Sequence, residues 1–72
     1  MRVLWRLRSP SSDQLTECQV IDRAPLFAHV RLIDVQLGIT IAWGSFTEIP
    51  VAVNAAAVLG AALQADGWFH LA

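Results

Sequence analysis

The segment from Pro50 to Ala65, PVAVNAAAVLGAALQA, constrains the fold of this chain more than any other. Alanine and leucine are strong helix formers and dominate the segment, so we predict one helix over these residues. Pro50 suits the first helical turn, where its missing N–H is not needed. Asp66-Gly67 places a glycine where helices commonly end in a left-handed residue, so the helix should end near Ala65.

The two faces of this helix are both apolar or small. At 100° per residue, the face assigned to the core holds Ala52, Ala55, Ala56, Leu59, Ala62 and Leu63. The opposite face holds Asn54, Ala57, Ala61 and Gln64, with Val53 and Gly60 at its margin. An outward helix face normally carries charged side chains, and this one carries none. We therefore predict that a partner covers the outward face, with Asn54, Ala57, Ala61 and Gln64 as the interface.

Length and composition also favour association. The chain of 72 residues is expected to form a single domain, residues 1–72, and a chain of this size buries only roughly 60% of its unfolded surface. A mean hydropathy of +0.51 with 15% charged residues indicates more apolar surface than one small core can hide. The single Cys18 cannot form an internal disulfide, and no Cys and His cluster has metal-ligand spacing. We predict a homo-oligomer without a metal or cofactor.

Charge and hydropathy exclude several other partners. A net charge of −1 gives no long-range attraction to nucleic acid or to anionic lipid. The apolar run 49–63 is shorter than the roughly 20 residues of a membrane-spanning helix, and it lacks the basic polar face of a helix that lies on a membrane. No secretory signal pattern opens the chain. The expectation is a soluble, cytoplasmic protein that binds neither nucleic acid nor membrane.

The first third of the chain predicts an antiparallel hairpin. In 2–8, Val3, Trp5 and Leu7 alternate with the arginines, interrupted only by Leu4, which predicts a strand with one apolar and one cationic face. Turn residues fill 9–13, and a second strand follows over 16–23, with Cys18 and Val20 on its apolar face. The stripe formed by Arg2, Arg6 and Arg8 is interpreted as a solvated face with acidic partners such as Glu17; an anion-binding surface is the alternative.

The middle of the chain contains a change of phase. After Ala24-Pro25, the apolar residues are even-numbered through Leu32 and odd-numbered from Ile33 to Trp43. Because the side-chain period of a strand is two, residues 33–38 must contain either a bulge or a hairpin turn, and we favour the turn. Residues 68–72 are predicted to form a final edge strand. The resulting order, ββββαβ, predicts an α+β fold: a small, mainly antiparallel sheet with one Ala-rich helix on one face.

Candidate binding chemistry is sparse. His29 and Arg31 share one strand face, where imidazole and guanidinium can hold a carboxylate or phosphate. His70 is a possible third polar group, and the walls of such a pocket would be Trp43 or Trp68, although the alternation assigns Trp5 and Trp43 to the core. Cys18 lies on an apolar strand face and is interpreted as a buried hydrophobe rather than a nucleophile. A metal site made of Asp34, His29 and His70 is disfavoured by their wide separation.

Two hypotheses follow. The first is a small self-associating structural or interaction module without catalytic activity, because no catalytic signature is present. The alternative is a small-molecule or anion-binding domain, or a minimal enzyme, that uses His29 and Arg31 beside a tryptophan-walled pocket.

Overall fold

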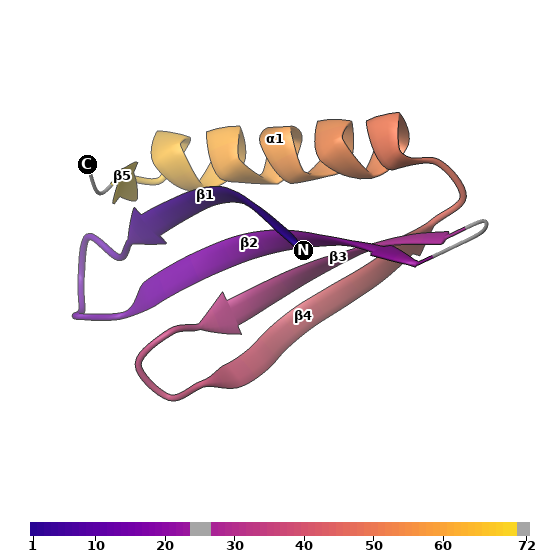
Figure 1. Ribbon diagram of the computed structural model, residues 1–72. Coiled ribbons are helices and arrows are strands. Elements are labelled where there is room, and N and C mark those ends of the chain that lie inside the picture. Colours follow the sequence, from indigo (N-terminus) through magenta and orange to yellow (C-terminus); the bar gives the residue numbers. More distant parts are fainter. Residues whose placement is uncertain (24–26, 71–72) are drawn as a thin grey trace.

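A computed structural model of the protein describes residues 1–23 and 27–70 (Figure 1). In chain order its elements are β1 (Arg2–Arg8), β2 (Leu15–Arg23), β3 (Phe27–Asp34), β4 (Ile39–Phe46), α1 (Ile49–Ala65) and β5 (Phe69–His70). The strands form one antiparallel sheet in the order β4-β3-β2-β1-β5, and α1 covers one face of it. The predicted α+β fold is confirmed. Ala24-Pro25, which precedes the third predicted strand, and the end of the predicted last strand, Leu71-Ala72, lie outside the described residues.

The phase change is resolved by a hairpin turn between β3 and β4, as favoured from the sequence. The Asp34 carboxylate accepts hydrogen bonds from the backbone N–H groups of Gln36 and Leu37, at 3.0 and 3.2 Å. Gly38 completes the turn with a φ of 68°, a conformation that glycine adopts without steric cost. The register then shifts between the Leu32–Ala42 and Ile33–Thr40 pairs, so Ile41 is the extra residue of a bulge in β4.

The core lies between α1 and the sheet and is centred on Trp5. The Trp5 indole Nε1 donates a hydrogen bond to the carbonyl oxygen of Ala56, at 2.9 Å, and so ties β1 to the helix. Small residues on the helix make this approach possible: a Cβ added to Gly60 would lie 2.8 Å from Trp5 Nε1. The remaining buried apolar residues are Leu7, Cys18, Val20, Ala28, Val30 and Ala52.

Both ends of α1 follow the sequence signals. Pro50 lies in the first turn, and Glu48 precedes the helix with an extended backbone. At the other end Gly67 has a φ of 99° and donates its N–H to the carbonyl of Gln64, while Trp68 donates to the carbonyl of Leu63, both at 3.0 Å. These two bonds form a Schellman motif, which reverses the chain and delivers β5 to the edge of β1. Over the described residues, no helix is long and apolar enough to cross a bilayer.

The assignment of the helix faces was wrong at two positions. Gly60, placed at the outer margin, is buried against Trp5, and Ala62, placed in the core, is exposed. The helix is therefore rotated relative to the prediction. Alanine and glycine differ little in hydrophobicity, so the alternation of apolar and polar residues did not fix the rotation. The bulky Trp5 fixes it, because its indole packs where a Cβ at position 60 would collide with it.

Two strand predictions also need correction, and both errors come from bulges. The register of β1 shifts between Val3 and Trp5, so Val3 is exposed, Leu4 packs against the core, and Arg2 lies opposite the core residue Val20. The predicted stripe of three arginines is thus divided between the two sheet faces. In β4 the bulge at Ile41 turns Trp43 away from α1, and 57% of Trp43 is exposed rather than buried as expected.

Candidate functional site

The outer face of α1 is exposed along its whole length. No residue of the helix is charged, and its exposed residues include three large apolar side chains, Ile49, Val51 and Val58, the last of which is 61% exposed. Five exposed positions follow one another at alternating steps of three and four residues: Val51, Asn54, Val58, Ala61 and Ala65. We call these five residues the outer seam. This spacing is the one by which two helices pack along each other in a coiled coil.

The four residues predicted as an interface are all exposed on this side of α1. Asn54 and Ala61 belong to the outer seam, and Ala57 and Gln64 flank it. The Gln64 amide also contacts the His70 imidazole of β5. Sequence reasoning missed Val51 and Val58, the largest exposed residues of the seam, although their seven-residue separation and the three-four spacing around them were visible in the sequence.

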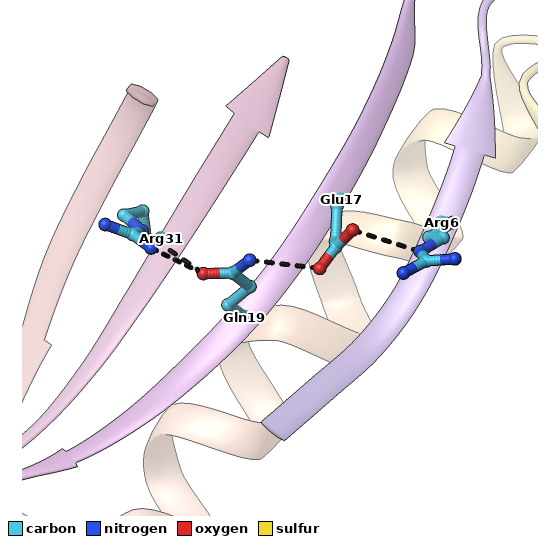
Figure 2. Close-up of polar contacts among 4 residues, drawn as sticks. All are labelled: Arg6, Glu17, Gln19 and Arg31. Atoms are coloured by element: carbon cyan, nitrogen blue, oxygen red, sulfur yellow. Dashed lines mark hydrogen bonds and ion pairs between the residues drawn. The ribbon is translucent and has the colours of Figure 1, made fainter. Parts of the chain in front are cut away.

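The sheet face opposite α1 carries a continuous polar chain (Figure 2). Arg6 Nε of β1 lies 3.0 Å from Glu17 Oε2 of β2, and Gln19 Nε2 donates to Glu17 Oε1, also at 3.0 Å. Arg31 of β3 donates from Nε and from a terminal nitrogen to Gln19 Oε1, at 3.3 and 2.8 Å. Both carboxylate oxygens of Glu17 and both ends of the Gln19 amide have a partner, so the two central residues stabilise the sheet and leave no side-chain group of their own without a hydrogen bond.

Three of the five candidate ligand-binding residues lie together at the β4 end of this face. The rings of His29 and Trp43 stack with centroids 4.5 Å apart, and His29 Nδ1 lies 2.9 Å from Ser45 Oγ. Arg31 is the cross-strand neighbour of Trp43. The arrangement presents an exposed aromatic surface beside one guanidinium group.

The other two candidates lie elsewhere. Trp68 is half-buried and packs against the core after the helix. His70 lies in β5, opposite Leu7 of β1, whereas His29 lies in β3, next to the opposite edge strand β4. The structure therefore does not bring His70 or Trp68 to the group formed by His29, Arg31 and Trp43.

Cys18 and the acidic residues form no further site in the described part of the chain. Cys18 is fully buried, and burial raises the pKa of its thiol to about 11, so the thiol is protonated at neutral pH. Asp34, considered as a metal ligand, uses its carboxylate to cap the β3–β4 turn. Among the described residues, no group of three His, Cys, Asp or Glu side chains is placed to hold a metal ion.

An apolar groove of about 200 Å³ lies between α1 and the β3–β4 half of the sheet. Its walls include Val30 and Leu32 of β3, Ala42 and Phe46 of β4, and Ala55 and Leu59 of α1. Alanines line the groove on both sides, Ala42 from β4 and Ala55 and Ala56 from α1.

Comparisons of the chain with protein-family models, with curated proteins and with solved structures gave no match.

Proposed function

We propose that the protein is a self-associating structural module, in which the outer seams of two copies pack against each other. The observation that carries this proposal is the exposed, uncharged face of a 17-residue helix. Monomeric proteins rarely leave a contiguous apolar surface of more than a few hundred Å² in water, and a helix that is apolar on both sides is usually covered on both.

The spacing of the outer seam supports a second helix as the covering element. Knobs at alternating steps of three and four residues insert into the holes of a facing helix. Small residues such as Ala61 and Ala65 allow two helix axes to approach closely, at the short end of the usual 8–10 Å range. Asn54 is the single polar residue of the seam, and one such residue typically fixes the register of a helix pair at some cost in stability.

Twofold symmetry makes Val58 the most informative position. Val58 is the middle residue of the seam, with two seam residues on either side. In a twofold pair of antiparallel helices centred on the seam, Val58 faces Val58 of the second copy, and in a parallel pair every residue faces its own counterpart. A charge introduced at Val58 therefore meets the same charge in the partner.

Charge exchange at Val58 tests the proposal. We expect V58E and V58K each to weaken association by at least about 100-fold, because each buries two like charges at the centre of the interface. Mixing V58E with V58K should restore a dimer, because the pair then carries opposite charges. The measurement is the solution mass by light scattering across a wide concentration range.

The control is S12E, which adds the same charge in the exposed loop between β1 and β2 and should leave the mass unchanged. A wild-type protein that stays monomeric at all concentrations contradicts the proposal. So does an unchanged mass of V58E, provided that circular dichroism shows the variant to be folded.

A second candidate function rests on the neighbouring positions of His29, Arg31 and Trp43. We propose as the alternative that this group binds a flat organic anion, which stacks on the exposed Trp43 ring while Arg31 supplies the positive charge. Benzoate is a suitable probe: titration should shift the NMR signals of the Trp43 indole and the His29 ring in the wild type and not in R31Q. Equal shifts in both proteins, or none, would remove this candidate.

A further inference from the structure

The outer edge of β4 is unprotected over a regular segment of five residues. β4 ends the order of the sheet, so one row of its backbone N–H and C=O groups has no strand beside it among the described residues (Figure 1). Natural proteins commonly protect such edges with charged side chains, proline or a bulge. β4 contains neither charge nor proline, and its bulge at Ile41 lies before the regular segment Ala42–Phe46.

We propose that this segment pairs with the same segment of a second copy, antiparallel and about a twofold axis at Gly44. An axis perpendicular to the sheet joins the two edges into one continuous sheet, with both helices on the same side. The segment is uncharged, so the pairing buries no unpaired charge. The inference uses a different surface from the outer seam and does not rest on it.

The sequence of the segment, AWGSF, is complementary to itself in size. With Gly44 at the axis, Ala42 lies opposite Phe46 of the second copy, and Trp43 lies opposite Ser45. Each large side chain therefore faces a small one, which is the condition for close cross-strand packing without overlap. This pattern selects a second copy of the chain rather than an unrelated strand.

The apolar groove is a second observation that favours pairing at the edge of β4. Ala42 and Phe46 line the groove on the β4 side. In the proposed register, Phe46 of the second copy lies beside Ala42, where it covers apolar surface that is otherwise open to water. One twofold pairing thus covers two grooves as well as two strand edges.

The association should be weaker than that of a stable dimer. Stable interfaces bury about 800 Å² per partner, and a five-residue edge supplies less than this. We therefore expect a dissociation constant on the order of 100 µM. At lower concentrations the edge is open, and it pairs as the concentration rises.

Hydrogen exchange and a charge at Ser45 test the pairing. In an unpaired edge strand, alternate backbone amides face water. With a dissociation constant of about 100 µM, about one fifth of the chains are unpaired at 1 mM, so we expect these amides of 42–46 to exchange about 5-fold more slowly at 1 mM than at micromolar concentration. S45K should raise the dissociation constant at least 10-fold, since it places a lysine on the pairing edge, and so reduce the slowing at 1 mM to about 2-fold or less. Both are measured in V58E as well as in the wild type, so that pairing through the edge is seen separately from pairing through the outer seam.

The matched control is S45A, which also loses the contact with His29 but adds no charge, and which should pair like the wild type. Amide exchange in 42–46 that does not depend on concentration overturns the inference, whatever the outer seam does. So does S45K with an unchanged dissociation constant. A charge effect at Val58 together with no effect at Ser45 overturns only the edge pairing and leaves the proposed function standing.

Discussion

The inner and outer faces of α1 have nearly the same composition and very different surroundings. On the inner face, the small residues Ala56 and Gly60 are explained by Trp5, which lies directly against them. On the outer face, Ala61 and Ala65 are equally small, and both are exposed. Small helix residues permit close approach of whatever lies opposite, and on the inner face that neighbour is visible. Under the proposed self-association, the outer residues are small for the same reason, and a second chain supplies the neighbour.

The largest effect should come from filling the inner face. G60V adds a branched side chain where even a Cβ would lie 2.8 Å from the buried Trp5 ring, so we expect the free energy of unfolding to fall by about 3 kcal/mol. The measurement is denaturant unfolding at a concentration where the protein is monomeric. A61V places the same valine side chain at the neighbouring outer position, where it points into water, and should change stability by less than about 1 kcal/mol. Equal losses in the two variants would contradict the distinction between the faces.

A pH titration tests how dry the inner side is. The folded pKa of Cys18 is about 11, against 9.0 for an ordinary thiol, so the unfolded chain loses its thiol proton first. The contribution of this thiol to the free energy of unfolding is therefore fully present below about pH 9 and is lost as the pH rises from about 9 to about 11. The full effect is on the order of 2–3 kcal/mol. The free energy of unfolding of C18A should not fall in this way over the same pH range. The same fall in both proteins would show that groups other than Cys18 cause it.

The smallest effect should come from Asn54 in the outer seam. N54A replaces a moderate helix former with the best one at an exposed position, so the monomer should gain about 0.5 kcal/mol of stability. Denaturant unfolding at low concentration measures the gain. A loss of more than 1 kcal/mol would mean that Asn54 has a structural partner within its own chain, which would remove the contrast between the two faces.

The sequence predicted the elements whose signals are local. The helix bounds follow from Pro50 and Gly67, and the β3–β4 hairpin follows from the phase change near Ile33. The errors in the strands arise where one residue is added to a strand. Bulges at Leu4 and Ile41 reverse the side-chain alternation, so Val3 and Trp43 are exposed although their spacing suggested burial.

Part of the candidate site was beyond sequence reasoning for a different reason. His29 and His70 were grouped by their chemistry, but β5 joins β1 and not β4, and the order of strands in a sheet depends on contacts distant in sequence. Gln19, which links Glu17 to Arg31 across the sheet, was not among the predicted site residues. The alternation of polar residues along β2 shows in the sequence that Gln19 lies on the polar face. The cross-strand register that places it between Glu17 and Arg31 cannot be seen there.

The pairing of β5 with β1 has a consequence for the order of folding. It joins Leu7 to His70, whereas β1 to β4 pair with their neighbours in sequence. Closing a loop of roughly 60 residues costs about 4 kcal/mol of chain entropy, more than a two-residue strand can repay. The packing of α1 on the sheet must therefore bring Phe69 and His70 into reach before they pair. We expect β5 to form last and to open first, so that the exchange of its amides reports the docking of the helix.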